Sequence, residues 1–375
     1  RRNGCSIARR KGAVKMRHVP FVIVGAGPAG LRAAKSLLEA GAEVLIIDRS
    51  PKVGGQLIKQ THMFFGSEKQ HASKRGIDIL DVMLQEVLGF EHVEIMMNTT
   101  VVGLYKDKVI SCLTGDTYFK IQADAIIIAA GASEKALPFE NNDLPGVYAA
   151  GAVQTLMNVY GVKPGDRVLM VGSGNIGLIV SYQLMQAGVE VVKLVEAAPA
   201  IGGYLVHASK IKRLGVDILT NTSIKRAIGK DSVEAAEIWQ LDDKWQGIPG
   251  TEDIIEIDTI CMAVGLAPLT ELLQQIGAKV KYVRELGGNV AVIDEHYETT
   301  IDNVYACGDV AGIEEASSAM IAGEIAGIEA ALKQGYKIPS HEDKLKILRH
   351  DLTQLRNGPH GAKVRAGLAK LGVEL

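Results

Sequence analysis

Cysteine is scarce in this sequence, and its four cysteines are widely separated. Cys5, Cys112, Cys261 and Cys307 form no C-x-x-C pair, and their spacing matches neither a disulfide framework nor a zinc site. The sequence also lacks an H-E-x-x-H segment and a Ser/His/Asp set for nucleophilic catalysis. We therefore expect a reducing, cytoplasmic environment and no bound metal ion.

Three further shortages narrow the class of protein. Aromatic residues make up only 5% of the chain, which disfavours an all-β fold. No stretch of 18 uncharged apolar residues occurs, so no membrane span is expected. The net charge of −2 gives no reason to expect a nucleic-acid partner. Glycine, by contrast, is abundant, with 41 of 375 residues in an otherwise ordinary α/β composition.

The first 18 residues contain seven lysines and arginines, no acid, and no methionine at position 1. We expect residues 1–17 to form a flexible basic arm. Two origins stay open: an over-extended start, in which Met16 would be the true first residue, or the end of an upstream domain. The apolar run that follows imitates a signal peptide, but it contains a dinucleotide-binding turn and is therefore expected to be a core strand.

An internal repeat is the most informative feature of the chain. Residues 22–57 align with residues 169–205. Each copy has an apolar strand, a G-x-G-x-x-G turn, a helix that ends at a glycine, and a second strand that ends on an acid. A Gly-Gly pair follows six residues after that acid. These features predict two βαβ units; the matched positions are Gly30 and Gly177, Gly41 and Gly188, Asp48 and Glu196, and Gly54–Gly55 and Gly202–Gly203.

The first turn has the pattern Gly25-x-Gly27-x-x-Gly30. The first glycine permits the tight turn, the second allows a pyrophosphate to approach the backbone, and the third allows the helix to pack on the strand. The start of the helix offers free N–H groups and a partial positive charge to the phosphates. Ala34 provides a small side chain in the helix, and Asp48 is placed for a ribose hydroxyl pair. This turn predicts a bound dinucleotide.

The second turn, Gly172-x-Gly174-x-x-Gly177, satisfies the same tests with Glu196 as its acid. Two alanines rather than arginines follow Glu196. A carboxylate here accepts a hydrogen bond from a ribose 2′-hydroxyl and repels a 2′-phosphate, so NAD(H) is favoured over NADP(H). The alternative is an inherited fold with an empty cleft, which the sequence leaves open.

A third element is the segment YACGDVAG with the helix expected from about Ser317 to Lys333. Asp309 follows Gly308 at a strand end and could accept hydrogen bonds from a polyol or ribityl chain. The helix dipole would favour negative charge beside Asp309. Alone, this Gly-Asp pair would be interpreted as a turn.

The elements of the chain also predict its domain organisation. Short strands are expected over 90–128, and the polar segment 134–146, with two prolines, is the expected linker. We expect a first domain of residues 18–145 plus 286–375, and a second domain of residues 146–285 inserted into it. The predicted fold class is α/β, with two Rossmann-like three-layer domains, the first discontinuous around the second.

Together these elements resemble the two-dinucleotide-binding-domain flavoproteins, the pyridine nucleotide-disulfide oxidoreductase superfamily. The resemblance covers roughly residues 18–335. It rests on the turn at 25–30, the AAG segment at 129–131 in the place of an ATG-like crossing, the Gly265-x-x-Pro268 turn, and the Gly-Asp pair at 308–309. It implies an FAD-binding first domain and an NAD(H)-binding second domain.

The resemblance also implies the cofactor contacts. For FAD they include the ADP moiety at the first turn and Asp48, the flavin near Gly55 and Gln56, and the ribityl chain at Asp309; the full set is Gly25, Ala26, Gly27, Pro28, Ala29, Gly30, Asp48, Arg49, Gly55, Gln56, Val102, Ala130, Gly131, Gly308 and Asp309. For NAD the set is Gly172, Gly174, Asn175, Ile176, Gly177, Glu196 and Gly265.

Within the superfamily, GGQLIKQTHMFFGS (54–67) and GPHGAKVRAG (358–367) resemble FAD α-type subunits of amine and amino-acid dehydrogenases. These include subunits of opine oxidase, hydrogen cyanide synthase, dye-linked proline dehydrogenase and sarcosine-oxidase-like complexes. The chain departs from the disulfide reductases of the superfamily because it has no cysteine pair, which disfavours disulfide reduction. An iron–sulfur centre would have to lie on a partner or upstream of residue 1, since no cysteine follows Cys307.

The segment after the first Gly-Gly pair carries four candidate side chains, Lys59, His62, Lys69 and His71. One of them could act as a base or orient a substrate carboxylate. The alternative is a solvated loop.

These observations predict an FAD-dependent oxidoreductase that transfers a hydride through flavin N5 to or from a small-molecule substrate. One route places the chain in an amine or amino-acid dehydrogenase complex, where its partner is a second flavoprotein or an electron-transfer subunit. In another, NADH at the second turn reduces the flavin, which reduces an unidentified acceptor. A non-enzymatic alternative is a cofactor-bearing assembly subunit.

Overall fold

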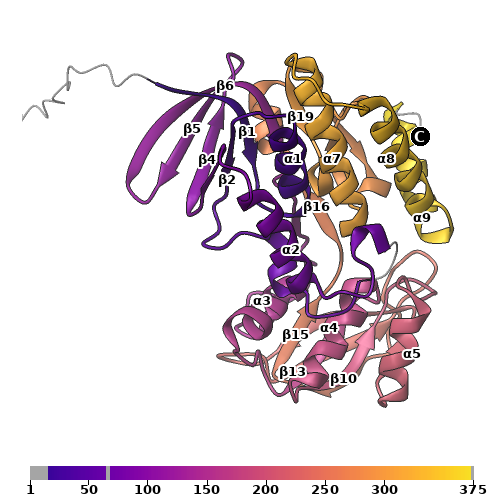
Figure 1. Cartoon of the computed structure of the whole chain (residues 1–375). Coiled ribbons are helices and arrows are strands. Elements are labelled where there is room, and N and C mark those ends of the chain that lie inside the picture. Colours follow the sequence, from indigo (N-terminus) through magenta and orange to yellow (C-terminus); the bar gives the residue numbers. More distant parts are fainter. Residues whose placement is uncertain (1–15, 65–67, 373–375) are drawn as a thin grey trace, which may run out of the picture.

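The most apolar segments of the chain form the centre of two parallel sheets. The computed structural model describes residues 16–64 and 68–372 and contains two α/β domains, one above the other in Figure 1. The predicted arm, like Cys5, lies outside the described residues up to position 15. Arg17, which we assigned to the arm, is instead the first residue of β1, and its guanidinium pairs with Glu94 at 2.6 Å.

The sheet of the first domain has the order β3-β2-β1-β6-β5-β4, with β19 also beside β6. Strands β1, β2, β3, β6 and β19 run parallel, whereas β4, β5 and β6 form an antiparallel meander. The strands are β1 (Arg17–Val24), β2 (Val44–Ile47), β3 (Val93–Met96), β4 (Thr99–Leu104), β5 (Val109–Thr114), β6 (Thr117–Ile128) and β19 (Val304–Ala306).

Strand β6 is one continuous strand, although the sequence suggested two. Its first half pairs with β5 over Thr117–Gln122, and its last three residues pair with β19 on the other side of the crossing. Residues 121–128 also pair with β1. One long strand thus belongs to both the meander and the parallel sheet.

The second domain repeats this plan with a parallel sheet of order β11-β10-β9-β15-β8. Its strands are β8 (Val147–Ala149), β9 (Arg167–Val171), β10 (Glu190–Val195), β11 (Asp217–Leu219) and β15 (Thr259–Met262). Helices α3 (Ala150–Tyr160), α4 (Asn175–Gln186) and α5 (Leu205–Arg213) pack on one core. A second core lies against the antiparallel strands β12 (Thr222–Ile228), β13 (Ala235–Gln240) and β14 (Asp253–Glu256).

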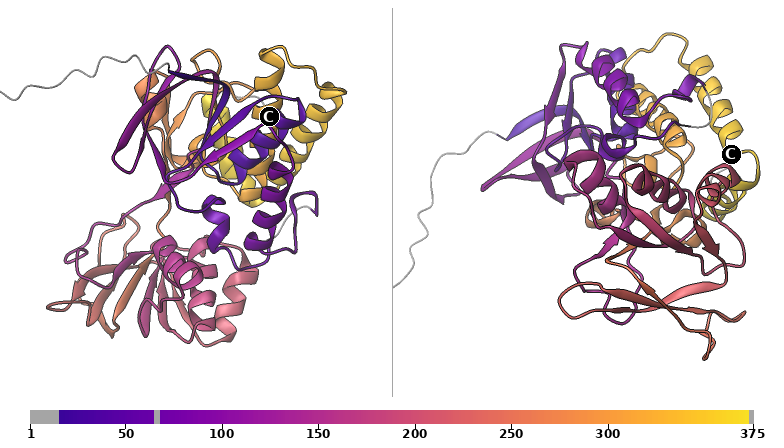
Figure 2. Two further views of the ribbon diagram at one scale, coloured as in Figure 1. Left: turned by 60° about the vertical axis from the view of Figure 1, so that its left-hand side comes forward. Right: turned by 90° about the horizontal axis from the view of Figure 1, so that it is seen from below.

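The chain passes between the domains at a two-stranded ribbon, visible at the waist of the molecule in Figure 2. It is formed by β7 (Ala132–Glu134) and β16 (Leu266–Pro268), which run antiparallel. Helix α6 (Glu271–Ile276) follows at once, and its Leu273 and Ile276 lie in the hydrophobic core of the first domain. The chain therefore returns at the ribbon, earlier than the boundary of 286 that the sequence suggested.

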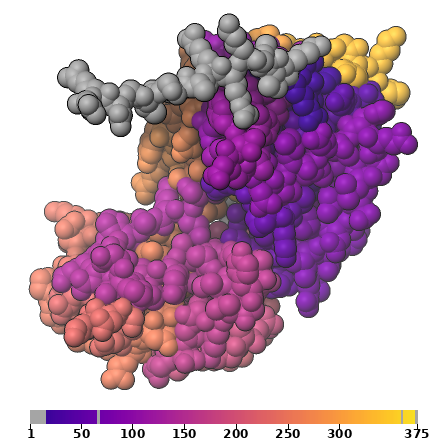
Figure 3. Space-filling model, turned by 90° about the vertical axis from the view of Figure 1, so that its left-hand side faces the viewer, coloured from indigo at the N-terminus to yellow at the C-terminus, as the bar shows by residue number. Residues whose placement is uncertain are grey.

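Residues after the ribbon complete the first domain. They form β17 (Val280–Val283), β18 (Gly288–Ala291), α7 (Ala316–Lys333), α8 (His341–Arg356) and α9 (Pro359–Leu371). The earlier helices of this domain are α1 (Pro28–Glu39) and α2 (Gly76–Leu88), and short 3₁₀ turns are η1 (Gly55–Lys59), η2 (Glu68–Gln70), η3 (Arg284–Leu286) and η4 (Gly308–Val310). Figure 3 shows the two domains as separate lobes. Within the described residues, no helix is long and apolar enough to cross a membrane.

Helices α1 and α7 pack backbone to backbone. A Cβ atom on Gly323 would lie 2.1 Å from the carbonyl oxygen of Ala29, and one on Gly327 would lie 2.5 Å from that of Ala33. Real Cβ atoms do not approach so closely, so glycine at 323 and 327 sets the distance between the two helices. This contact fixes the start of α1, where the first glycine turn ends, against α7.

Replacing Gly323 by alanine should separate these helices. Overpacking of this kind costs about 1–3 kcal/mol, so Gly323→Ala should lower the free energy of unfolding by that amount in urea titrations. Gly89→Ala is the matched control, because Gly89 has a helical φ of −68° and an added Cβ there meets its nearest atom at 3.5 Å. Equal stability of the two variants would contradict this account of the α1–α7 contact.

Candidate functional site

The first glycine turn connects β1 to α1 and is held by the neighbouring strands. Gly25 has a φ of +113°, and its amide donates to the carbonyl oxygen of Ile47 at 2.8 Å. A Cβ on Gly25 would lie 2.2 Å from the Ala129 oxygen, and a Cβ on Gly30 would lie 1.9 Å from the Gly25 oxygen. The first and third glycines are therefore required by backbone strain and close packing, as the sequence predicted.

Asp48 ties this turn to the end of β2. One carboxylate oxygen accepts the amide of Ala26 at 2.7 Å, and the other accepts the amide of Ser50 at 2.8 Å. A carboxylate has about four acceptor positions, so both oxygens can still accept a ligand hydroxyl. Asp48 thus shapes the turn and stands where the sequence placed a ribose-binding acid.

Three backbone segments meet in front of α1 with little side-chain volume between them. A Cβ on Gly55 would lie 2.9 Å from the Cα of Gly27, and one on Gly308 would lie 2.8 Å from the Cβ of Ala29. The Gly54 amide donates to the Ala26 oxygen at 2.9 Å. Glycine at these contacts lets the turns at 25–30, 54–56 and 308–310 converge on the start of α1, where Pro28 is the first helical residue. This cradle suits the pyrophosphate and ribityl parts of an FAD.

The second glycine turn reproduces these hydrogen bonds one for one. Gly172 has a φ of +106°, and its amide donates to the Val195 oxygen at 2.8 Å. Glu196 accepts the amides of Ser173 and Ala198 at 2.8 and 2.9 Å. The Gly203 amide donates to the Ser173 oxygen at 2.8 Å, as Gly54 does to Ala26. The repeat seen in the sequence is therefore a repeat of the same local structure.

The second turn has one addition that sequence reasoning missed. The hydroxyl of Ser173 donates to Glu196 at 2.6 Å and accepts the Gly202 amide at 3.0 Å. The only sequence signal was a serine between the first two glycines. Asn175, the first residue of α4, accepts the amide of Tyr204 at 2.8 Å. These bonds close the Gly202–Gly203 loop over the start of α4.

Asp309 lies in η4, half-buried beside the start of α7. Burial raises the pKa of Asp309 to about 6, and the nearby Glu314 carboxylate adds to the rise, while a backbone hydrogen bond from Glu314 opposes it. Helix α7 has no acid in its first turn, so its N–H groups face this region without a competing charge. A hydroxyl-rich ligand chain would give this carboxylate the hydrogen bonds that burial takes from it.

The remaining predicted contacts lie at different distances from these turns. Arg49 and Gln56 are exposed next to Asp48 and Gly55, and Gly131, with a φ of +74°, accepts the Leu269 amide at the domain ribbon. Ala130 precedes it and is half-buried, as is Gly174, whose Cβ position is open. Ile176 is 39% exposed at the start of α4.

Two predicted contacts lie further from the turns. Val102 is 43% exposed at a bulge in β4, and Thr99 rather than Val102 reaches the first acid, donating its amide to the Asp48 oxygen at 2.9 Å. Gly265 is exposed with a φ of +113° and accepts the Lys135 amide at 3.0 Å where the ribbon begins. Its place near a nicotinamide stays a prediction, as does a cofactor contact of Val102.

Lys59 and His62 lie where the two domains meet. Lys59 donates to the Gly151 oxygen at 3.0 Å, and Asn158 donates to the Lys59 oxygen at 2.7 Å. Burial lowers the pKa of His62 to about 4, and the positive charges of His207 and Lys210 on α5 lower it further. His62 is therefore neutral at neutral pH. These contacts make Lys59 a link between domains, and a catalytic role for either residue stays a prediction.

Lys69 and His71 contact other helices of the first domain. Lys69 pairs with Asp351 of α8 at 2.8 Å. His71 lies 2.9 Å from Arg32 of α1, whose guanidinium can only donate, so the imidazole nitrogen accepts. Burial and the Arg32 charge lower the pKa of His71. The structure thus does not bring these two side chains together with Lys59 and His62.

A hydrogen bond between the domains connects the two turns. The Tyr204 hydroxyl donates to Glu315 at 2.5 Å. Tyr204 follows the second Gly-Gly pair, and Glu315 is the N-cap of α7. Gln183 of α4 also donates to Thr61 at 2.8 Å. No sequence signal pointed to these pairs, because they depend on how the domains dock.

Cys112, Cys261 and Cys307 are free and fully buried in strands or at a strand end. Burial raises the pKa of Cys112 to about 11 and that of Cys307 to about 12, and it raises that of Cys261 as well. Thiols of this kind stay protonated and unreactive at neutral pH. Within the described residues, no cysteine pair is present to pass electrons to a disulfide.

Comparison with known proteins agrees with the resemblance seen in the sequence. The chain is 28% identical over 276 residues to the alpha subunit of sarcosine oxidase from Rhizobium meliloti strain 1021, 26% identical over 333 residues to the HcnB subunit of hydrogen cyanide synthase from Pseudomonas protegens, and 25% identical over 328 residues to the A-subunit of opine oxidase from Agrobacterium tumefaciens strain Ach5. The alignments cover 70%, 84% and 83% of this chain. They cover only 26% of the sarcosine oxidase subunit, 70% of HcnB and 65% of the opine oxidase subunit.

Two solved structures share the fold. L-proline dehydrogenase from P. horikoshii has a TM-score of 0.68 at 23% identity, covering 90% of this chain and 59% of the other. Thioredoxin reductase from T. acidophilum has a TM-score of 0.70 at 24% identity, covering 85% of this chain and 99% of the other. Both likenesses confirm the predicted arrangement of two Rossmann-like domains.

The family described as pyridine nucleotide-disulphide oxidoreductase matches residues 19–335, which include both glycine turns and Asp309. With this match and the two turns described above, the chain belongs to the pyridine nucleotide-disulphide oxidoreductase family of FAD-dependent oxidoreductases.

Proposed function

We propose that this chain is the FAD-binding part of an amine or amino-acid dehydrogenase complex with a proline-, sarcosine- or opine-type substrate. The observation that carries the proposal is the glycine cradle at the start of α1, formed by the turns at 25–30, 54–56 and 308–310. The named relatives support the substrate class, because sarcosine oxidase, opine oxidase and proline dehydrogenase are all named for amino-acid derivatives. The buried, unpaired cysteines argue against disulfide reduction.

Each part of the cradle has a distinct task in this proposal. The N–H groups at the start of α1 bind the pyrophosphate, and Asp48 accepts hydrogen bonds from the ribose hydroxyls. Asp309 accepts hydrogen bonds from the ribityl chain, and the start of α7 favours negative charge beside it. When bound, FAD supplies hydride transfer at N5 of its ring, and the protein holds and orients the reactants.

We infer a partner protein from the same relatives, since several are named as subunits. A second flavoprotein or an electron-transfer subunit would receive the electrons, because the chain's described cysteines are buried and unpaired. The exposed segments near Gly55 and the domain ribbon leave the FAD region accessible to such a partner.

A second candidate function is favoured by the second turn. Its hydrogen bonds match those of the first turn, and Glu196 holds the amides of Ser173 and Ala198 as Asp48 holds those of Ala26 and Ser50. This supports NADH binding and an NADH-dependent reductase of an unidentified acceptor.

The substrate class is tested by anaerobic titration of the FAD-loaded chain, with and without a co-purified partner. Proline, sarcosine or an opine should bleach the flavin absorbance, because a hydride from the amine carbon reduces the ring. Glycine betaine, which has no N–H and cannot form an imine, is the control and should leave the spectrum unchanged. A protein that binds no FAD, or bleaching by none of the amino acids in the partner-bound complex, would contradict the proposal.

The second candidate is tested by NADH. If NADH binds at the second turn, Glu196→Arg should weaken NADH binding by at least about tenfold, because it removes the ribose acceptor and the bonds that shape the loop. Flavin bleaching by NADH in stopped flow gives the readout, with FAD content measured separately. Glu234→Arg changes the net charge equally at an exposed site and should behave as wild type. Undiminished NADH binding in Glu196→Arg would exclude this turn as the NADH site.

Asp309 should make the stability of the cofactor-free chain depend on pH. Its pKa is about 6 in the folded chain and 3.8 ordinarily, so the protonated acid stabilises the fold below about pH 4, and this stabilisation is lost as the pH rises through 6. Asp309→Asn should therefore raise the Tm of the FAD-free protein at pH 7–8, make no difference near pH 4, and weaken FAD binding. Thermal scans across this range check it, with exposed Asp116→Asn as control. A lower Tm at pH 7–8 would contradict it.

A further inference from the structure

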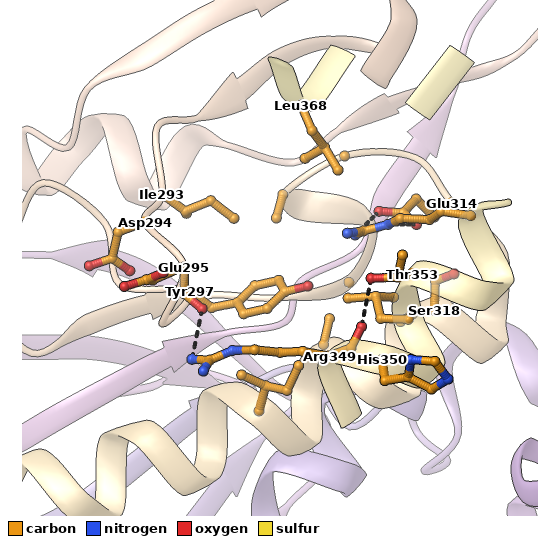
Figure 4. A pocket seen from close by; sticks show the side chains of 18 residues that line it. Ile293, Asp294, Glu295, Tyr297, Glu314, Ser318, Arg349, His350, Thr353 and Leu368 are labelled. Atoms are coloured by element: carbon orange, nitrogen blue, oxygen red, sulfur yellow. Dashed lines mark hydrogen bonds and ion pairs between the residues drawn. The ribbon is translucent and has the colours of Figure 1, made fainter. Parts of the chain in front are cut away.

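A cavity of about 390 Å³ lies in the first domain behind the Gly308–Gly312 turn. Its walls come from the 293–297 turn, α7, α8 and one residue of α9 (Figure 4). Helices α8 and α9 follow residue 335, where the match to the family ends. The cavity is therefore formed between the family fold and a C-terminal extension, and of the predicted FAD contacts only Gly308 lines it.

One end of the cavity is polar and deeply buried. The side chains of Tyr297, Ser318 and Arg356 line it, although their residues are only 9%, 6% and 7% exposed. Figure 4 shows the Tyr297 ring extending across the cavity towards Ser318 and Thr353. Burial raises the pKa of Tyr297 to about 12, so its hydroxyl keeps its proton and can donate. Buried donors that face an open cavity are suited to an acceptor group of a ligand.

Arg356 is held in place by an acid and a phenol. Its Nε and Nη2 donate to the two carboxylate oxygens of Glu314 at 3.0 and 2.6 Å, a bidentate pair on one edge of the guanidinium. Arg356 also forms a side-chain hydrogen bond with Tyr297, in which the phenol oxygen accepts and keeps its own proton for another acceptor. Because a guanidinium carries five N–H donors, Arg356 retains donors for a ligand. Arg356 and the Tyr297 and Ser318 hydroxyls thus provide donors at the same end of the cavity.

The other acids around the cavity already have partners. Glu329 pairs with Arg349 at 2.7 Å, and Asp294 accepts the amides of His296 and Glu298, both at 2.9 Å. The ligand group that fits is consequently an anion or acceptor rather than an ammonium group. Arg349 and the exposed His350 add donors from α8.

The opposite wall is apolar. It is formed by Ile293, Ala322, Ile325, Leu352 and Leu368. Burying a short alkyl group against such a wall is favourable by about 0.8 kcal/mol per CH₂. A volume near 390 Å³ falls in the lower part of the range of small-molecule sites.

We propose that this cavity binds a small apolar monocarboxylate. Its carboxylate faces Arg356, Tyr297 and Ser318, and its alkyl group packs on Leu352, Leu368 and Ile293. The site is separate from the glycine turns and does not depend on the substrate of the flavin reaction.

Butyrate is the probe for this site, used in isothermal titration calorimetry with the full FAD-loaded chain. Saturable binding at one site per chain is expected in the millimolar range. Tyr297→Phe should weaken it about tenfold, since a buried hydrogen bond to a charged group contributes about 1.5–3 kcal/mol. Tyr282→Phe is the matched control, because Tyr282 is 69% exposed on β17, and it should bind as wild type.

A second pair of measurements keeps the test independent of the stability of Tyr297→Phe. Ala322→Leu should fill the apolar end and abolish butyrate binding while the flavin spectrum and Tm stay normal. Butyramide, which has the same shape without the charge, should bind at least tenfold more weakly than butyrate. No saturable binding of butyrate, binding that survives Ala322→Leu, or equal binding of butyramide would overturn the proposal. FAD content and amino-acid bleaching are read separately, so failure here does not affect the proposed function.

Discussion

A carboxylate at the end of a β-strand holds a glycine turn at each cofactor region. Asp48 accepts the Ala26 amide and Glu196 accepts the Ser173 amide, at 2.7 and 2.8 Å. Each acid also accepts the amide two residues after itself, so the turn and the strand end are fixed together. The N–H groups that begin α1 and α4 keep their direction because of these bonds, and the helix termini can then bind phosphates. The rest of the proposed chemistry depends on this arrangement.

The two copies differ in what surrounds this shared bond. The first turn meets Gly55 and Gly308 and lies against α7, which is kept close by Gly323 and Gly327. The second turn is closed by Ser173 and Asn175, and Tyr204 then reaches across to Glu315 at the start of α7. One duplicated unit has thus become an FAD cradle in an FAD-dependent family and, in our proposal, a nicotinamide site docked against it. The buried thiols leave electron transfer to the cofactors and to a partner.

The parts of the site that could be predicted from sequence are those set by local geometry. Gly25, Gly172, Asp48 and Glu196 follow from spacing, because a tight turn and a strand end constrain residues close in the chain. The Tyr204–Glu315 bond could not be predicted, since it joins residues 111 positions apart through domain docking. For the same reason, the return to the first domain was placed at 286 rather than at β16, and β6 was divided at a point where its pairing partner changes. The cavity under α8 also depends on long-range packing.

Native mass spectrometry of the purified chain tests the central claim most directly. The account predicts one FAD on each chain, and one further NADH on each FAD-bound chain when NADH is added. It also predicts that Asp48→Ala lowers the fraction with FAD, whereas Glu196→Ala lowers only the fraction with NADH. A chain that binds no FAD under reconstitution, or an Asp48→Ala chain that retains it fully, would contradict the claim that the carboxylate-held turn is the FAD site.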